Sequence, residues 1–182
     1  YTITVTDQNG CQVSDNVTVL EPPLLAIGSM SQDSVSCNGL SDGTATANNI
    51  TGGTGSYTYL WSDGQTTNPA TGLGIGTYTI TVTDQNGCQV SDNVTVLEPP
   101  LLAIGSMSQD SVSCNGLSDG TATANNITGG TGSYTYLWSD GQTTNPATGL
   151  GIGTYTITVT DQNGCQVSDN VTVLEPPLLA IG

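Results

Sequence analysis

The sequence predicts an all-β fold, with tandem immunoglobulin-like β-sandwich modules in a linear array and one disulfide per module. Three observations predict it. A 77-residue unit repeats without change, so that YTITVTDQNG begins at Tyr1, Tyr78 and Tyr155. Thr, Val, Ile and Tyr alternate in short runs, as in half-buried strands. Each unit also carries one Trp and two Cys, which are features of small stapled sandwiches.

The repeat sets the domain organisation. Glu-Pro-Pro recurs at 21–23, 98–100 and 175–177, and two successive prolines end a strand and make a short, stiff connection. We therefore expect complete modules at 24–100 and 101–177. Residues 1–23 are expected to be the C-terminal part of a preceding repeat and 178–182 the start of the next. Because the sequence opens within a strand pattern, we expect it to be a piece of a longer periodic protein.

The elements of one unit follow from alternation and turn residues. A Gly-rich turn is expected at 51–55, and Asn86-Gly87 is a strong hairpin signal. No stretch has helical periodicity. The predicted strands are 24–31, 44–50, 56–61, 77–83 and 88–97, with a loop over 33–43 and a weak edge segment over 65–71.

The aromatic residues favour the sandwich. Trp61 ends a predicted strand, and Tyr78 follows a Gly turn at the start of a late strand, as in a tyrosine corner. We expect both to be core residues, together with their copies Trp138 and Tyr155. Alternation places Tyr57 and Tyr59 on the same face as Trp61. An aromatic platform for sugars is the alternative reading of that face.

Five cysteines in a Thr-, Ser- and Gly-rich chain indicate an oxidising, extracellular setting. Pairing within a unit gives Cys37–Cys88 and Cys114–Cys165, with Cys11 bonded to an upstream partner. This pairing is favoured because it closes a loop of about 50 residues, worth roughly 4 kcal/mol in the chain-entropy model. The alternative crosses the unit boundary as Cys11–Cys37 and Cys88–Cys114. Zinc is disfavoured because the chain has no His and no CxxC.

The charge excludes several classes of partner. The chain has 15 acidic residues and no Lys, Arg or His, so its net charge is −15. Without cations it cannot neutralise phosphates, which disfavours nucleic acid and anionic lipid. No apolar run reaches the roughly 20 residues of a membrane span, so no direct membrane insertion is expected. Nucleophile–base pairs of the usual kinds are also lacking, so an enzyme is not expected.

Calcium is the one candidate cofactor, because Asp, Asn and carbonyl oxygens in Gly-rich loops suit a hard cation. The competing explanation is that these residues form turns. The calcium candidates are Asp84, Asn86, Asp92, Asn38 and Asp42.

The motifs CNGLSDG, TGGTGSYTYLW and GLGIGTYTITVTDQNGC occur in this order in each unit. In order and spacing they strongly resemble the SprB repeat of Bacteroidetes surface proteins, and more distantly PKD-like immunoglobulin folds. The resemblance covers nearly every residue of a unit. It implies a giant adhesin of gliding bacteria, exported by type IX secretion and held at the outer membrane. It also implies that the two cysteines of a repeat pair with each other. Asp-Ser-Val at 33–35 and 110–112 matches the Asp-Ser/Thr-hydrophobic acceptor of O-glycosylation in Bacteroidetes, so the resemblance makes Ser34 and Ser111 candidates for this modification.

These observations lead to a functional expectation. We expect a repetitive extracellular stalk or filament of a bacterial cell-surface adhesin, mediating surface attachment and gliding through many weak contacts with abiotic surfaces or polysaccharide. We also expect copies of the chain to associate with one another into filaments. The alternative is a purely structural fibre or spacer, with adhesion carried by other domains.

Overall fold

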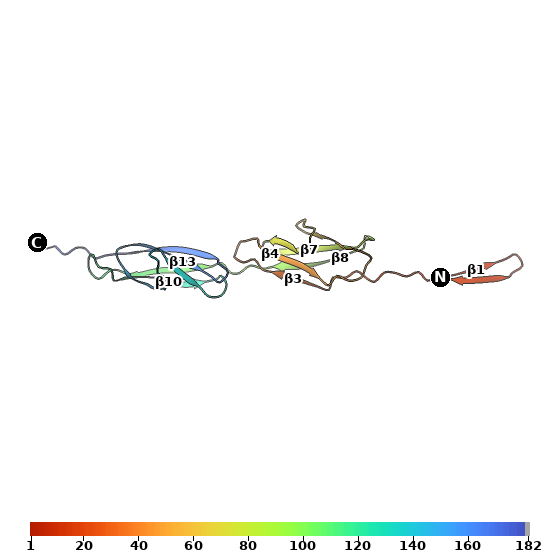
Figure 1. Cartoon of the computed structure of the whole chain (residues 1–182), viewed down its shortest axis with the longest axis horizontal. Coiled ribbons are helices and arrows are strands. Elements are labelled where there is room, and N and C mark those ends of the chain that lie inside the picture. The colour runs from red at the N-terminus through yellow and green to blue at the C-terminus, as the bar shows by residue number, and fades with distance from the viewer. Residues whose placement is uncertain (181–182) are drawn as a thin grey trace.

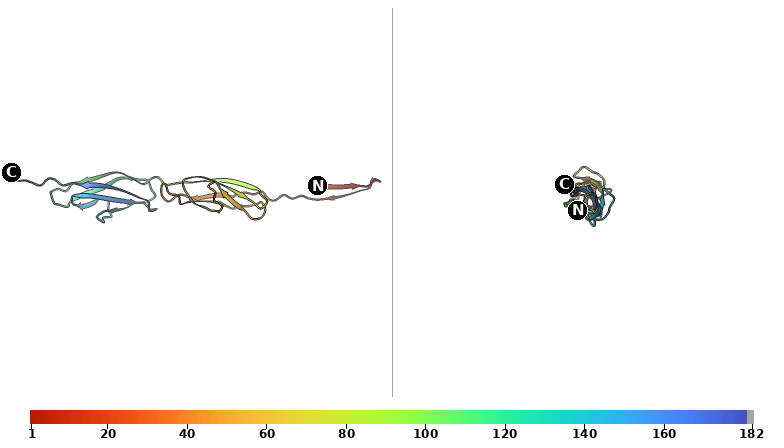
Figure 2. Two further views of the ribbon diagram at one scale, coloured as in Figure 1. Left: turned by 90° about the horizontal axis from the view of Figure 1, so that it is seen from above. Right: turned by 90° about the vertical axis from the view of Figure 1, so that its left-hand side faces the viewer.

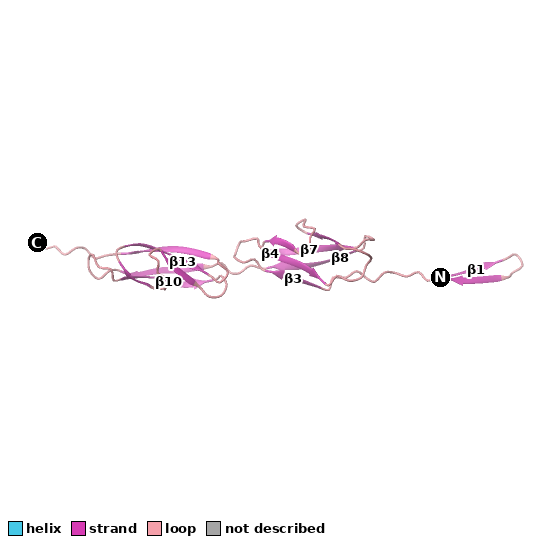
Figure 3. Cartoon of the chain, viewed as in Figure 1, coloured by secondary structure: helices cyan, strands magenta, loops and turns pink. Residues whose placement is uncertain are grey.

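The computed structural model describes residues 1–180 of the chain, so the expected start of a further repeat at 178–182 lies partly outside the described residues. The described residues contain strands, turns and loops and no helix (Figure 3). None of them forms a helix long and apolar enough to cross a membrane. A lone hairpin and two strand-rich modules follow one another along one axis (Figure 1).

The first module has six strands, in two antiparallel sheets of three. One sheet has the order β3-β4-β6 and the other β5-β7-β8. This order, with the two sheets packed face to face, is that of an immunoglobulin-like sandwich. The fold class is therefore tandem β-sandwich modules, as predicted. The strands are β3 (Ser29–Asp33), β4 (Gly43–Asn48), β5 (Thr58–Trp61), β6 (Ala70–Leu73), β7 (Gly76–Thr83) and β8 (Gln89–Val96).

The second module repeats this arrangement, with sheets β12-β10-β9 and β11-β13-β14. Its first two strands are longer at the N-terminal end of the module than β3 and β4 are in theirs. They include the pair Ala103–Thr128, whereas the corresponding pair Ala26–Thr51 in the first module is an isolated bridge. The strands are β9 (Ala103–Asp110), β10 (Gly120–Thr128), β11 (Thr135–Trp138), β12 (Ala147–Leu150), β13 (Gly153–Thr160) and β14 (Gln166–Val173).

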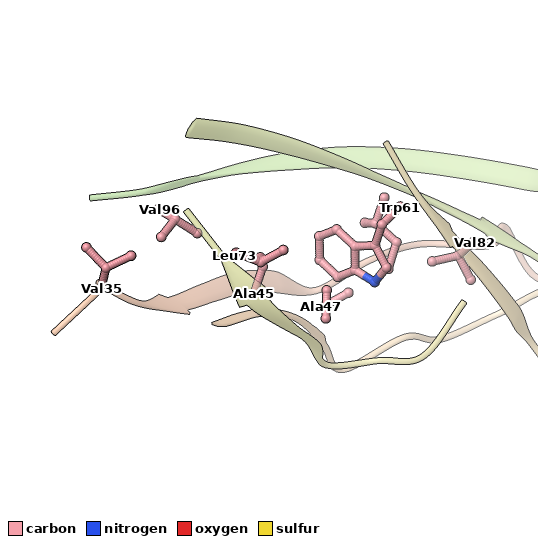
Figure 4. Close-up of a cluster of buried hydrophobic side chains, with 9 residues drawn as sticks. Val35, Ala45, Ala47, Trp61, Leu73, Val82 and Val96 are labelled. Carbon is pink, nitrogen blue, oxygen red and sulfur yellow. The ribbon is translucent and has the colours of Figure 1, made fainter. Parts of the chain in front are cut away.

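The core of each module lies between its two sheets. Trp61 is 1% exposed, and its ring lies beside Ala47 and Leu73 in the close-up (Figure 4). Small alanines on β4 face the large ring, which lets the two sheets approach. Trp138 is buried to the same extent in the second module. The other buried members of the first core are Val35, Ala45, Ala70, Ile80, Val82 and Val96.

Trp61 on β5, Tyr78 on β7 and Tyr57 just before β5 also donate hydrogen bonds to backbone carbonyls. The Trp61 Nε1–H donates to the Thr67 carbonyl at 2.8 Å, and the Tyr57 hydroxyl donates to the Gly52 carbonyl at 2.7 Å. The Tyr78 hydroxyl donates to the Gly74 carbonyl at 3.2 Å, the bond of a tyrosine corner, and Tyr155 does the same with Gly151. Tyr57 and Tyr59 pack against the core, so the structure does not present this aromatic face as an open platform.

The weak edge segment lies later than predicted. The sequence indicated 65–71, whereas β6 spans Ala70–Leu73. Asn68 explains the shift, because its side-chain amide donates to the Ala47 carbonyl at 2.8 Å and accepts from the Ala47 N–H at 3.0 Å. The side chain thus takes the place of a strand residue beside β4, and backbone pairing starts only after it.

Residues 1–23 form a separate hairpin. Strands β1 (Thr2–Thr6) and β2 (Gln12–Asn16) pair in the register of β7 and β8, whose sequence they share. Ile3 and Val5 are 64% and 57% exposed, whereas the equivalent Ile80 and Val82 are fully buried. Side chains that face the core in a complete module are therefore exposed in the hairpin, because no second sheet covers them.

Candidate functional site at the module joint

The feature that distinguishes this molecule from two separate sandwiches is the joint between them. Seen from the side and down the long axis, the modules lie in line, end to end (Figure 2). The exit pole of the first module, formed by residues 34–42 and 97–99, meets the entry pole of the second. That entry pole is formed by residues 100–102, 129–131 and 161–165. The joint brings together segments far apart in sequence.

A disulfide crosses this joint. Cys37 of the first module is bonded to Cys165 of the second, with a Cα–Cα distance of 5.7 Å. The predicted pairs Cys37–Cys88 and Cys114–Cys165 are therefore wrong, and so is the alternative Cys11–Cys37 with Cys88–Cys114. The structure has a disulfide between modules rather than one within each. Cys11, Cys88 and Cys114 are free and exposed among the described residues.

Strand direction explains the correction. Cys88 follows the β7–β8 turn at the entry pole, and β8 then runs to the exit pole. Eight residues at about 3.3 Å each separate the poles by roughly 26 Å. Cys37 lies at the exit pole, where the neighbouring Val35 N–H donates to the Leu97 carbonyl at 3.0 Å. A disulfide needs Cα atoms within about 7 Å, so the two cysteines of one unit cannot meet.

Glu98-Pro99-Pro100 is bonded to both modules. The Glu98 carboxylate accepts from the Gly39 N–H at 2.9 Å, and the Pro99 carbonyl accepts from the Asn38 side chain at 3.1 Å. On the other side, the Pro100 carbonyl accepts from the Gly130 N–H at 2.8 Å. Prolines cannot donate, but their carbonyls still accept. The connection is therefore fixed to the exit loop of one module and the entry turn of the next.

Direct contacts between the modules complete the joint. The Asn163 side-chain amide of the second module donates to the Ser36 carbonyl of the first at 3.0 Å. Cys37 and Cys165 are half-buried here, whereas their exact sequence copies Cys114 and Cys88 are exposed at the outer poles. The difference in burial comes from the joint itself, because the sequences are the same. A groove beside it is lined by Ser34, Val35, Leu97, Glu98, Thr131 and Asn163.

A close approach at the entry pole requires glycine. Gly129 has a φ of +74°, and a Cβ there would overlap the Leu101 carbonyl oxygen. Any side chain would push the Gly-rich turn away from the first residues of the module. The turn is thus shaped to lie against the chain as it enters from Glu-Pro-Pro.

Asp84 and its copy Asp161 organise the entry pole. Asp84 is 5% exposed, and its carboxylate accepts from the N–H groups of Thr54 at 2.8 Å, Asn86 at 3.0 Å and Cys88 at 2.8 Å. Burial alone would raise the pKa of Asp84, but the bonds from Cys88, Thr54 and Asn86 outweigh burial and lower it below the ordinary carboxyl range. The charged carboxylate therefore ties the hairpin turn to the Gly-rich turn.

Asp42 has a similar role at the exit pole. The Ser36 hydroxyl and N–H both donate to its carboxylate, the N–H at 2.9 Å. These two bonds, the hydroxyl's first, lower the pKa of Asp42. Ser36 is also the residue whose carbonyl accepts from Asn163 across the joint. Asp42 therefore supports the loop that carries Cys37.

The calcium candidates do not form one cluster. Asp84 and Asn86 lie at the entry pole, whereas Asn38 and Asp42 lie at the exit pole. Asp92 is exposed in the middle of β8, where its carboxylate accepts from the Asn93 N–H. Among residues 1–180, no three or more acidic, Cys or His side chains are placed to hold a metal ion. The carboxylates at the poles act instead as acceptors for backbone N–H groups.

The two glycosylation candidates lie at exit poles. Ser34 and Ser111 are exposed, each directly before a buried valine, Val35 or Val112. Ser34 also lines the groove at the joint. Both hydroxyls are thus on the surface, while the hydrophobic residue of each Asp-Ser-Val motif is used by the core.

Sequence reasoning did not identify Asn163 or Gly129 as joint residues. One signal could have located the poles. Only one strand separates each second cysteine from the following Glu-Pro-Pro, and only one strand separates Glu-Pro-Pro from the next first cysteine. Counting strands from the joint therefore places the two cysteines of a unit at opposite ends.

The fold and joint define a class of protein, namely an extended array of β-sandwich modules joined end to end by a disulfide and hydrogen bonds. The SprB repeat family model matches the chain twice, over residues 29–66 and 106–143. Each module therefore contains one segment that the SprB repeat model matches, and such repeats suggest a cell-surface repeat region of the adhesin type. A comparison with curated proteins finds no match.

Proposed function

We propose that this chain is part of the extracellular stalk of a bacterial surface adhesin, attached at the outer membrane, that contributes to surface attachment and gliding. The observation that carries the proposal is the joint. Two modules that each contain a SprB match are held in line by a disulfide, by the Asn163–Ser36 bond and by hydrogen bonds from the connection 98–100 to both modules. A stalk must keep its distal end away from the cell, and a fixed joint between repeats provides that extension.

The outward face of β7 and β8 supports attachment through weak contacts. Thr77 and Thr95 hydroxyls bond across the strands at 2.9 Å, and Thr81 and Ser91 do so at 3.1 Å. The same exposed hydroxyl- and amide-rich face recurs on β13 and β14. Such a face offers donors and acceptors to polysaccharide hydroxyls. Repetition along one chain converts weak contacts into avidity.

The net charge of −15 suits the same role. Like-charged stalks repel one another at short range, which keeps neighbouring chains apart in the low-salt regime where screening is weak. Export by type IX secretion and glycosylation at Ser34 and Ser111 belong to this proposal, and intact-mass measurement of protein from source cells tests the glycosylation.

The second candidate function is that of a spacer. The fixed joint supports it equally, because a rigid connection is needed whether or not the modules bind a surface. The test is adsorption of purified chain to agar, glass and polysaccharide. The test variant has glutamate in place of Thr79 and Thr156, which are central on the outward face, and it is compared with the parent chain. Adsorption that falls with these substitutions supports the adhesin, and no adsorption of the parent chain supports the spacer.

Motility is tested on cells. Fluorescent Fab fragments against the repeat are bound to living source cells and followed over time. Labels that travel along the cell surface support a gliding adhesin. Static or shed labels contradict the gliding part of the proposal and leave a surface fibre.

A further inference from the structure

We propose that the Cys37–Cys165 bond is the repeating link of a covalent brace that bypasses the interior of every module, so that tension cannot extend the array by unfolding it. The bond joins residues 128 positions apart in sequence. Force applied to the two ends of the chain is carried by residues 1–37, by the disulfide and by the residues from 165 onward. Residues 38–164 lie outside this path.

The outer poles present the same surfaces as the joint. At the entry pole of the first module, exposed Cys88 lies beside Pro22, Pro23 and Leu24. At the exit pole of the second, exposed Cys114 lies beside Ser113, Asn115 and Pro176. These are the sequence copies of the residues that meet at the joint. The partner that fits each outer pole is therefore another unit of this repeat.

The rule for pairing follows from the period. The first cysteine of each unit bonds to the second cysteine of the next unit, as Cys37 bonds to Cys165. By the same step Cys114 bonds to a cysteine one unit further on, and Cys88 to one from the unit before. Each bond forms when two thiols release two protons and two electrons. A thiol–disulfide oxidoreductase in its disulfide form accepts them by exchange and becomes a dithiol.

The backbone segments that link successive bonds are already extended. One such segment runs from Cys88 to Cys114, a separation of 26 residues. It contains β8, Glu98-Pro99-Pro100 and β9, which run in one direction from the entry pole of one module to the exit pole of the next. Strand residues rise about 3.3 Å, and a fully stretched chain reaches about 3.6 Å per residue. The braced array can therefore lengthen by only about a tenth.

Without the brace the behaviour is very different. A 77-residue unit that unfolds under tension releases a contour of roughly 270 Å, at about 3.5 Å per residue. Surface attachment subjects a stalk to repeated pulling, and an unbraced array would lengthen each time a module opened. With the brace, β4 to β7 of a module can open while the length of the stalk is kept.

Single-molecule pulling on the whole chain tests the brace. The background variant keeps only Cys37 and Cys165 (Cys11→Ser, Cys88→Ser, Cys114→Ser), and the matched control adds Cys165→Ser. The control should release about 450 Å more contour than the oxidised variant, from 128 residues at about 3.5 Å each. Reduction of the variant in the same instrument should release the same extra length, which holds whether or not a serine substitution disturbs folding.

A chain extended by one further 77-residue unit tests the repeat of the bond. When the unit is added after residue 182, the bond of Cys114 to it replaces a 77-residue step of the covalent path with the 51 residues from Cys114 to Cys165. Cys114→Ser should therefore lengthen the contour by 26 residues, or roughly 90 Å at about 3.5 Å each. Equal contour lengths for oxidised variant and control would overturn the proposal. A short contour in the two-unit chain with no effect of Cys114→Ser in the extended chain would also overturn it, because the brace would then not repeat.

Discussion

Replacing Trp61 with alanine tests the core and the independence of the modules together. Trp61 is 1% exposed, packs between the sheets and donates its Nε1–H to Thr67. Truncation of a buried Trp costs about 3–5 kcal/mol through lost burial and the cavity left behind. With a urea m-value of roughly 1–3 kcal/mol per M for a small domain, a loss of about 4 kcal/mol lowers the midpoint by roughly 1.3–4 M.

Only the first module should respond. The chain has two Trp residues, one per module, so Trp138 becomes the sole Trp reporter in the variant and reports the second module. Far-UV circular dichroism follows both modules. We expect dichroism to show an early transition that Trp138 fluorescence does not. Leu60→Ala is the matched control, because Leu60 is adjacent on β5 and 55% exposed, and it should change the midpoint little.

Two results would refute this reasoning. An unchanged dichroism midpoint in the Trp61→Ala chain would mean that Trp61 does not support the core. A fall in the Trp138 midpoint as large as the fall in the dichroism midpoint would mean that the two modules unfold as one unit.

Three further predictions follow from named bonds. Tyr78→Phe removes the hydroxyl bond to Gly74 and should destabilise the first module by about 1 kcal/mol in urea denaturation, whereas an effect near zero would contradict a tyrosine corner. Asn68→Ala leaves the Ala47 N–H and carbonyl without their partner and should cost about 1–3 kcal/mol, and a midpoint equal to the parent's would exclude that role. The lowered pKa of Asp84 contributes stability above the ordinary carboxyl pKa near 4, which is lost as pH falls through the lower native value. Asp84→Asn should therefore lower the thermal midpoint at pH 7 and flatten its fall in acid, and a parallel acid profile in both chains would refute this.

Much of the fold could be predicted because strand periodicity and turn residues are local signals. Alternation in 77–83 and the Asn86-Gly87 turn specify β7, β8 and their hairpin. The expected edge segment at 65–71 was misplaced because the Asn68 side chain replaces backbone pairing beside β4. A side chain that substitutes for a strand residue leaves no periodic pattern in the sequence.

The joint could not be predicted by the same means. Loop-closure entropy favoured Cys37 with Cys88, but it says nothing of where each cysteine lies in the fold. The length of β8 keeps these two apart, and module stacking brings Cys37 to Cys165 instead. The Asn163–Ser36 bond likewise depends on how the modules stack. Identical repeats also hide such contacts, since no position differs between units.

The identity of the units affects how the pairing can be measured. Cys37 and Cys114 lie in identical stretches, as do Cys88 and Cys165, so a disulfide-linked peptide cannot distinguish the pair within a unit from the pair across the joint. The chain also has no Lys or Arg for trypsin. Variants that keep two chosen cysteines avoid both problems.

Counting free thiols in two such variants of the whole chain is therefore the most direct test of the brace between modules. One keeps Cys37 and Cys165, the other keeps Cys37 and Cys88, and each is oxidised, labelled with maleimide in denaturant and weighed. The structure predicts no labelled thiol in monomers of the first and two labelled thiols in monomers of the second. Two labels on the first and none on the second would show that the disulfide lies within the module and would contradict the account.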